Sequence, residues 1–448
     1  MKKPRGTLAL VSLGCAKNAV DLQVRAGALV KDGWTLSPDP DRADCVIVNT
    51  CSFIAAAREE AEAEIRRALE LKSRGQYGRV VVTGCYPQRY PQLKRAFPGV
   101  DEWIGVPKDW EEPAVPALRL TGKAFAYLKI AEGCAHRCSY CAIPLIRGKY
   151  RSRPKASILR EARALVKTGC RELNVVAQDP MLWREGDERL TDLLWAIDKI
   201  PGDFWVRVLY TYPSEITEEF VIWLSTSKHA VRYVDVPIQH TVPEVLEKMN
   251  RKRVIEPSRC AAEVLREIVP DVTLRTTVMT GFPGETEARF NAMLADLKRM
   301  QFDHLGAFAY SPEEGTKGAK MKGRPSRAVA EAREKLVREQ QAKIWHLKAK
   351  RFVGRTFRAL VVAPGVARLA SQAPDVDGVT FLQGRRKKEE GRSVEGRSVE
   401  GRSAEGRSAE GTFPSVGEFV DVKIVKVKGF DFVAEVVAEG GRAVTRDA

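Results

Sequence analysis

Three cysteines within one short loop constrain this chain more than any other feature. Cys134, Cys138 and Cys141 follow a C-x3-C-x2-C spacing. Four-iron clusters are held by cysteine thiolates, and three thiolates leave the fourth iron open, as a catalytic metal site requires. The alternative is a structural zinc site with His136 as the fourth ligand, although such sites usually combine two pairs of ligands. The loop therefore favours a catalytic iron–sulfur cluster.

Length and charge limit the kinds of protein that this chain can be. The 448 residues suffice for about three domains, and no apolar run approaches the roughly 18 residues of a membrane helix. Residues 1–13 lack a small-residue cleavage site, so we expect no signal peptide and a cytoplasmic location. There, cysteines serve as metal ligands or buried thiols rather than in disulfides. The net charge of +16 favours contact with a polyanion such as nucleic acid or the ribosome, although a basic composition alone also produces it.

The first region, residues 5–118, predicts a parallel α/β domain. Strand-like segments at 7–13, 45–49 and 79–83 alternate with helical stretches. A cysteine follows each strand, namely Cys15, Cys51 and Cys85. Because ligands bind at the carboxyl ends of parallel strands, we expect these three thiols to converge on a second cluster with an open iron. Three unrelated buried cysteines are the alternative.

The remaining cysteines serve as an internal comparison. Cys45 opens the second predicted strand and so lies at the opposite end from Cys51. Cys170 and Cys260 have no cysteine at ligand spacing. We expect all three to be ordinary buried thiols.

The central region, residues 120–350, predicts a partial (β/α)6 TIM-like barrel. Helical stretches separate six strand-like segments, which are 126–130, 172–177, 205–209, 232–237, 272–280 and 305–310. Function in such folds lies at the carboxyl-end rim, and the cysteine loop follows the first strand. A charged helical stretch at 324–350 is expected to link domains or to cover an edge.

Two further features fall on this rim. The Gly-Phe-Pro-Gly-Glu segment from Gly281 to Glu285 follows the fifth strand, and its glycines would let the backbone approach a nucleoside, with a purely structural turn as the alternative. His240 follows the fourth strand. A lone histidine there is more often structural than a general base, so we expect no catalytic group beyond the cluster ligands.

The third region, residues 351–445, predicts a small antiparallel β-barrel. Strand-like segments at 356–362, 417–427 and 431–437 are separated by turn residues. A low-complexity five-residue repeat at 391–410 has no apolar periodicity and cannot bury a core. We interpret it as an insertion between two strands.

The three regions together resemble the methylthiotransferases, in which an N-terminal three-cysteine domain, a radical S-adenosylmethionine (SAM) core and a TRAM domain follow one another. The segment at 12–21, Ser-Leu-Gly-Cys-Ala-Lys-Asn-Ala-Val-Asp, is similar to the branch that modifies small-subunit ribosomal protein twelve, the RimO type. The tRNA-modifying branch, the MiaB type, usually has Gly-Cys-Gln-Met-Asn there. Segments 173–179, 310–316 and 372–378 are also similar to the ribosomal branch, whereas Pro180 and Met181 and the 391–410 repeat depart from it.

This resemblance implies specific roles for named residues. Cys134, Cys138 and Cys141 would hold a [4Fe-4S] cluster whose electron cleaves SAM to a 5'-deoxyadenosyl radical. Tyr140, Gly281 and Glu285 would bind SAM. A second [4Fe-4S] cluster on Cys15, Cys51 and Cys85 would carry the sulfur, which one SAM methylates. The radical from another SAM would remove hydrogen from the β-carbon of an aspartate, and the methylthio group would replace it.

The resemblance also implies partners. They are ribosomal protein twelve or the assembled small subunit, an electron donor such as flavodoxin or ferredoxin, and a contact with rRNA, without any membrane. Two other functions stay open from the sequence: a tRNA adenosine methylthiotransferase with the same chemistry, and a non-catalytic iron–sulfur protein that binds RNA. The second would neither bind nor cleave SAM.

Overall fold

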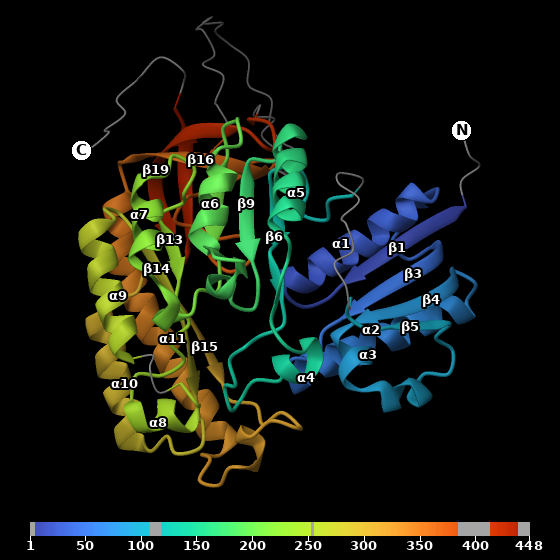
Figure 1. Cartoon of the computed structure of the whole chain (residues 1–448), viewed down its shortest axis with the longest axis horizontal. Coiled ribbons are helices and arrows are strands. Elements are labelled where there is room, and N and C mark those ends of the chain that lie inside the picture. The colour runs from blue at the N-terminus through green and yellow to red at the C-terminus, as the bar shows by residue number, and fades with distance from the viewer. Residues whose placement is uncertain (1–4, 108–117, 252–254, 384–412, 438–448) are drawn as a thin grey trace, which may run out of the picture. The chain divides into compact units, whose positions relative to one another are not determined.

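The computed structural model describes residues 5–107, 118–251, 255–383 and 413–437, and only the backbone of residues 255–261. The chain divides into two compact units between Ile344 and Trp345. The first unit contains a parallel sheet domain and a second, larger set of βα repeats, and the second unit is a small closed barrel (Figure 1). The 391–410 repeat lies outside the described residues.

A five-stranded parallel sheet, ordered β2-β1-β3-β4-β5, forms the N-terminal domain. Its central strands are apolar runs packed against helices, as buried parallel strands require. The strands are β1 (Gly6–Ser12), β2 (Trp34–Leu36), β3 (Ala43–Thr50), β4 (Tyr77–Gly84) and β5 (Glu102–Ile104), and the helices are α1 (Ala16–Lys31), α2 (Ala55–Ser73) and α3 (Cys85–Arg89), followed by the 3-10 turn η1 (Pro91–Ala96). The three predicted strands are confirmed, whereas the three-residue edge strands β2 and β5 were not expected from the sequence.

Six parallel strands form the centre of the chain, and all six were expected from the sequence. They are β6 (Phe125–Lys129), β9 (Glu172–Val176), β12 (Trp205–Val208), β13 (Tyr233–Asp235), β14 (Thr273–Thr280) and β15 (His304–Ala309). They pair as two three-stranded sheets, ordered β12-β9-β6 and β13-β14-β15, and a bridge between Val206 and Ala230 connects them. The predicted partial barrel is therefore confirmed, with its sheet interrupted between the third and fourth strands.

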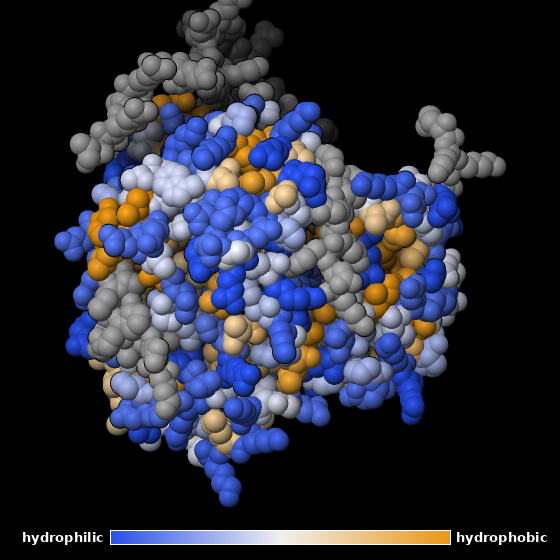
Figure 2. Space-filling view, viewed as in Figure 1, coloured by the Kyte–Doolittle hydropathy of each residue, from blue (hydrophilic) through white to orange (hydrophobic). Residues whose placement is uncertain are grey.

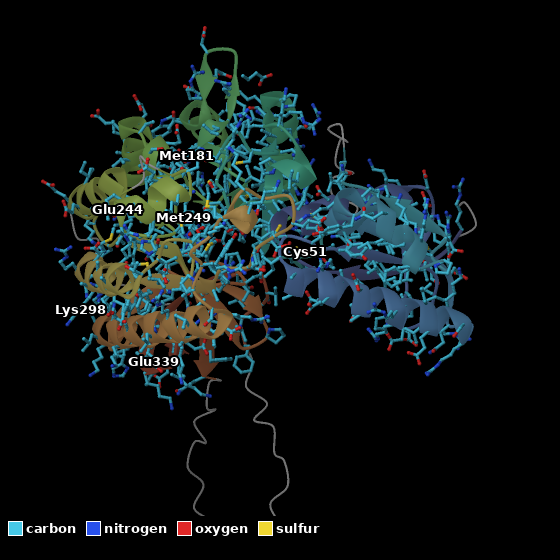
Figure 3. All side chains as sticks on the ribbon, turned by 90° about the horizontal axis from the view of Figure 1, so that it is seen from below. Cys51, Met181, Glu244, Met249, Lys298 and Glu339 are labelled. Carbon is cyan, nitrogen blue, oxygen red and sulfur yellow. The ribbon has the colours of Figure 1, made fainter. Side chains whose placement is uncertain are left out.

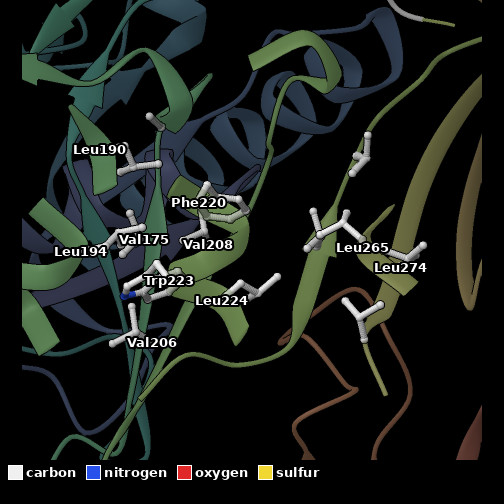
Figure 4. Close-up of a cluster of buried hydrophobic side chains, with 14 of the residues drawn as sticks. Val175, Leu190, Leu194, Val206, Val208, Phe220, Trp223, Leu224, Leu265 and Leu274 are labelled. Atoms are coloured by element: carbon white, nitrogen blue, oxygen red, sulfur yellow. The ribbon is translucent and has the colours of Figure 1, made fainter. Parts of the chain in front are cut away.

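Helices after each strand cover the outside of this partial barrel. They are α4 (Ile143–Arg147), α5 (Lys155–Lys167), α6 (Leu190–Asp198), α7 (Glu218–Thr226), α8 (Pro243–Lys248), α9 (Ile255–Ile268), α10 (Glu287–Met300) and α11 (Arg327–Ala349), with the short elements β7 (Ala131–Glu132), β8 (Arg151–Ser152), β10 (Arg184–Glu185), β11 (Glu188–Arg189), η2 (Pro180–Leu182), η3 (Pro213–Glu215) and η4 (Gly318–Lys320). Figure 4 shows part of the core, where Val206 and Val208 of β12 pack with Phe220 and Trp223 of α7. Branched strand residues and large helix residues exclude water here, which stabilises the scaffold of the rim.

The charged helix α11 covers the free edge of the last strand. Glu334 accepts a hydrogen bond from the Ala309 backbone N–H at 3.1 Å, and Arg338 donates to the Ala307 carbonyl oxygen at 3.1 Å. Such side chains satisfy groups that an uncovered edge strand would expose. The expectation that this helix covers an edge is thus met.

The second unit is a closed barrel with the strand order β16-β17-β18-β20-β19. Its elements are η5 (Lys350–Phe352), β16 (Thr356–Ala363), β17 (Val366–Leu369), β18 (Thr380–Gln383), β19 (Phe419–Lys428) and β20 (Asp431–Val436). Trp345, Ile424 and Phe432 lie in its core. The predicted small barrel is confirmed, with one departure from the antiparallel expectation. β18 and β20 pair in parallel, whereas the other pairs are antiparallel. β17 and β18 are too short to show a pattern in the sequence.

Hydrophilic residues dominate the face of the molecule in Figure 2, with apolar residues in small groups. None of the described helices combines the length and apolar character that a membrane span needs.

Candidate functional site

The loop between β7 and α4 presents Cys134, Cys138 and Cys141. Its entry requires Gly133, which has a φ of +74° and whose position leaves no room for a Cβ, because that atom would lie 2.2 Å from the Lys149 carbonyl oxygen. Cys141 lies just before α4, where its sulfur accepts the Ile143 N–H at 3.4 Å. All three side chains are partly buried and interact electrostatically with one another. Burial raises the pKa of Cys134 to about 11 and that of Cys141 to about 12.

Arg251 supplies the positive charge beside this triad. Its Nη1 lies 3.6 Å from the Cys138 sulfur and 3.5 Å from the Tyr140 hydroxyl, and its Nη2 donates to the Pro237 carbonyl oxygen at 2.7 Å. The guanidinium also covers the Tyr212 ring at 4.2 Å from the ring centre. A buried cation beside cysteine sulfurs fits an anionic thiolate-bound cluster, whose properties depend on such hydrogen bonds.

His136, the zinc ligand considered above, is engaged elsewhere. Its Nε2 lies 2.6 Å from Asp179 Oδ2, and its ring stacks on Tyr212 at 3.8 Å between centres. Within the described residues, no three His, Cys, Asp or Glu side chains meet as they would around one metal ion. A four-iron cluster, in contrast, bonds each thiolate to a different iron and so holds the sulfurs further apart.

The predicted nucleoside segment connects β14 to α10. Gly281 has a φ of +76°, and a Cβ there would lie 2.3 Å from Ala330 Cβ of α11, so packing on α11 alone requires glycine. The Glu285 carboxylate accepts the Gly281 N–H at 2.9 Å and pairs with Arg333 at 2.7 Å. Both contacts use Oε1 of this buried carboxylate, so Glu285 stabilises the turn and its packing on α11.

His240 is buried in the same region. Its Nδ1 accepts the Val242 N–H at 3.0 Å, and its Nε2 lies 3.3 Å from Glu285 Oε2. These contacts fit the structural role expected from the sequence.

A cavity of about 960 Å³ opens beside the loop triad. Tyr140, Gln239, Met279 and Gly281 line one part of it. Further residues come from the turn before α2, from β15 and the segment after it, and from α11, among them Phe53, Phe308, Glu313, Arg324 and Glu331. A site for a small molecule of SAM's size usually occupies 300–1,000 Å³, so the cavity has room for such a cofactor.

The second triad is assembled from three strand ends. Cys15 begins α1 after β1, Cys51 follows β3 and Cys85 opens α3 after β4; Figure 3 labels Cys51. A Cβ on Gly14 would lie 2.8 Å from Cys51 Cβ, so the first two turns are in contact. The three thiols also influence one another electrostatically. The structure thus brings together the cysteines that the strand pattern predicted would converge.

The surroundings of the second triad change the pKa values of its three thiols in different directions. Desolvation raises the pKa of the Cys15 thiol, but the charges of Lys17 and Arg147 lower it, and the net change in pKa is downward. Burial raises the pKa of Cys51, and it raises that of Cys85 to about 12. Arg147 donates to the Cys85 sulfur at 3.5 Å. As at the loop triad, a guanidinium beside a cysteine sulfur fits an anionic cluster.

Arg147 also belongs to a buried network that joins α1 to the cysteine loop. Its guanidinium pairs with Asp21 at 2.8 Å and with Glu132 at 2.9 Å, and Lys129 pairs with the same two carboxylates. Burial opposes the ionisation of Glu132, but Lys129 and Arg147 lower its pKa to about 2. Two cations and two carboxylates balance, which makes their burial tolerable.

Asn18 ties the turns of the second triad together. Its side-chain amide donates to the Leu13 carbonyl oxygen at 2.8 Å and to that of Thr50 at 3.1 Å, next to Cys15 and Cys51. Sequence reasoning missed Asn18, Arg147 and Arg251 as site residues. Asn18 and Arg147 stand close to predicted ligands in the sequence, whereas nothing local marks Arg251.

The two comparison cysteines whose side chains the structure describes are buried in hydrophobic clusters. Cys45 is buried among Leu8, Leu22 and Val81, and burial raises its pKa to about 11. Cys170 is buried in the core of the central domain, and burial raises its pKa to about 11 as well. The side chain of Cys260 lies outside the described residues.

Comparisons with known proteins agree with this arrangement. The Radical SAM superfamily model matches residues 128–297, the Uncharacterized protein family UPF0004 model matches residues 7–105, and the TRAM domain model matches residues 353–437. The radical SAM match implies that the chain uses SAM and a [4Fe-4S] cluster.

Relatives extend the match over most of the chain. A ribosomal protein uS12 methylthiotransferase RimO of Syntrophus aciditrophicus is 40% identical over 417 residues, which are 84% of this chain and 92% of that protein. A protein of the same description from Desulfitobacterium hafniense is 34% identical over 464 residues, 96% of this chain and 98% of that protein. The solved structure of TsrM, a radical S-adenosylmethionine methyltransferase of Kitasatospora setae, shares the fold, with a TM-score of 0.51 and 19% identity over 68% of this chain and 76% of that one. The chain therefore belongs to the RimO family of ribosomal protein uS12 methylthiotransferases, within the radical SAM enzymes.

Proposed function

We propose that this protein methylthiolates the β-carbon of an aspartate in ribosomal protein uS12. The net change replaces one carbon–hydrogen bond by a bond to a sulfur that carries a methyl group. The observation that carries the proposal is that one compact unit holds two cysteine triads, each with a buried guanidinium at a cysteine sulfur. Family membership supports the same chemistry.

The two triads take different roles in this proposal. Cys134, Cys138 and Cys141 hold the cluster that serves SAM, and Cys15, Cys51 and Cys85 hold a second [4Fe-4S] cluster. When bound, the first cluster and SAM supply the radical that removes the hydrogen, and the second cluster supplies the sulfur. Tyr140, Gly281 and Glu285 belong to the SAM site, Tyr140 and Gly281 as part of the cavity wall and Glu285 by holding the turn.

The chain's own residues position and shield the reaction. Arg251 fixes Tyr140 and Cys138 through its two contacts and keeps a positive charge beside the loop. Arg147 and Lys129 hold α1, and with it Cys15, against the cysteine loop. A rigid connection of this kind is what bringing a target carbon to a reactive group requires.

Partners follow from the same proposal. The substrate is uS12, free or within the assembled small subunit, and the basic charge favours an additional contact with rRNA. Reduction requires an electron donor such as flavodoxin or ferredoxin, and the reaction takes place in the cytoplasm. The domain limits that we propose are 5–118, 120–350 and 351–445, the last with the 391–410 insertion.

The test is mass spectrometry of small-subunit ribosomal proteins from cells with and without the gene. We expect a methylthio group on one aspartate of uS12 that disappears with the gene and returns with the intact gene, but not with a Cys138→Ala copy. Unmodified uS12 in both strains, together with a lost methylthio group on a tRNA adenosine, would move the substrate to the tRNA branch.

A further inference from the structure

Lys17 is a buried cation whose only effect described above is to lower the pKa of Cys15. It lies in the first turn of α1, two residues after Cys15, and only 8% of it is exposed. The first turn of α1 contains no acidic residue. A positive charge is unfavourable at the positive end of a helix dipole, and burying an ammonium without an anion is costly.

No carboxylate among the described residues pairs with Lys17. The Nζ atom lies 3.4 Å from the centre of the Tyr210 ring. In the part of the chain that the structure describes, Lys17 forms no ion pair with a carboxylate and no hydrogen bond to a cysteine sulfur. A ring face attracts a cation from one side only. An ammonium has three N–H donors, so the ring does not engage all of them. Lys17 therefore has donors available for an anion.

Tyr210 holds a strained backbone at this contact. It follows β12 on the rim and has a φ of +70°, which is unusual for a bulky residue. Its N–H donates to Asp235 Oδ2 at 3.2 Å, which holds that conformation. Strain of this kind concentrates at functional sites. The ammonium is thus fixed between the turn of Cys15 and the rim of the central domain.

We infer that Lys17 binds the side-chain carboxylate of the substrate aspartate. This inference rests on the proposed function and deepens it. The carboxylate carbon is bonded directly to the β-carbon that reacts, so a cation that holds the carboxylate also fixes the β-carbon near the triad of Cys15. A single buried charge–charge contact distinguishes aspartate from asparagine, which has the same shape.

The competing role for Lys17 is to balance the charge of the cysteine sulfurs. Arg147 already fills that role through its contact with the Cys85 sulfur. Lys17 faces the Tyr210 ring and makes no comparable contact with sulfur in the described residues. The two roles predict different results when only the charge of Lys17 is removed.

The experiment compares binding of uS12 and of a uS12 variant with the target aspartate changed to asparagine. The reconstituted holoenzyme is used unaltered, as Lys17→Met, which keeps an unbranched chain, and as Lys31→Met, an exposed lysine of the same helix that serves as control. We expect the unaltered enzyme and the control to prefer the aspartate form by about tenfold or more. Lys17→Met lowers this ratio to about one, with unchanged iron content.

A preserved preference in Lys17→Met would overturn the inference, and so would loss of iron from that variant, which would assign Lys17 to the cluster. Should Lys17→Met not fold, Lys17→Gln carries the same measurement. Failure of the unaltered enzyme to methylthiolate uS12 would refute the proposed function instead, so the two failures are distinguishable.

Discussion

The two cysteine triads reach the same ligand chemistry by opposite routes. The loop triad spans Cys134 to Cys141, and its geometry depends on local backbone features such as Gly133. The N-terminal triad takes its members from three strand ends, and its geometry depends on the order and register of a whole parallel sheet. The ligands of the loop triad can thus be predicted from cysteine spacing alone, whereas those of the N-terminal triad can be predicted only once the fold is predicted.

The triads are alike in one charged group beside their sulfurs and differ in another. Each has a buried guanidinium at one sulfur, Arg251 at Cys138 and Arg147 at Cys85. Only the N-terminal triad has in addition an ammonium, Lys17, whose charge lowers the pKa of Cys15. This asymmetry fits a division in which one triad serves the cofactor and the other faces the substrate.

The largest effect is expected for the loop triad. Cys138→Ala removes a ligand that two others cannot replace, so formation of 5'-deoxyadenosine from SAM should fall to background and no methylthio product should form. Chromatography of the reaction mixture measures both. Normal SAM cleavage in this variant would show that the loop does not hold the catalytic cluster.

Cys51→Ala should separate the two activities. We expect SAM cleavage to persist while the methylthio product is lost, and iron to fall to about half because one of two clusters is missing. Iron analysis and mass spectrometry of uS12 measure this. Full product formation would contradict the second cluster.

Arg147→Met tests whether the two triads depend on one buried network. Removing this guanidinium leaves Asp21 and Glu132 with a single cation, which should lower the free energy of unfolding of the first unit by about 3 kcal/mol or more. Denaturant unfolding of the anaerobic protein measures it. The control Arg327→Met breaks an exposed pair with Glu331 and should leave the free energy of unfolding nearly unchanged. Equal effects of the two substitutions would show that the buried network stabilises the protein no more than a surface pair does.

Arg251→Met should act on the loop cluster alone. A nearby positive charge favours the reduced, more negative cluster, so its removal should lower the reduction potential of that cluster and leave the other unchanged. A redox titration followed by electron paramagnetic resonance measures both potentials. A shift of both clusters, or of neither, would contradict the separate environments.

The smallest effect is expected for Cys45→Ala. Cys45 is buried away from both triads, so iron content and product formation should stay unchanged, with a loss of stability of about 1 kcal/mol. Cys51→Ala serves as the matched comparison, because Cys45 lies near the start of β3 and Cys51 directly follows its end. Loss of half the iron in Cys45→Ala would show that the ligands were misassigned.

Much of the fold was predictable because its main strands lie in β-rich segments between helices, and even the three-residue β13 lies within the longer predicted segment 232–237. All six central strands and the three main N-terminal strands followed from that pattern. The edge strands β2 and β5 have three residues each, too few for any periodicity, and only pairing with a neighbour defines them. The interruption of the sheet between β12 and β13 likewise depends on how the strands pack, which the sequence pattern does not show.

The site was predictable as far as its cysteines and less so beyond them. Arg251 reaches Cys138 from 113 residues away, and no local pattern announces such a contact. Glu285 was expected at the SAM site, and the structure shows its carboxylate occupied by Gly281 and Arg333. That Lys17 has no carboxylate partner among the described residues became evident only when its burial and the ring of Tyr210 were known.

Electron paramagnetic resonance of the reduced Cys51→Ala and Cys138→Ala proteins, with and without SAM, tests most directly that each triad holds its own cluster. We predict that Cys51→Ala retains one cluster whose signal changes when SAM is added, and that Cys138→Ala retains one cluster whose signal does not change. Loss of all clusters from either variant, or a response to SAM in Cys138→Ala, would contradict two separate clusters with separate roles.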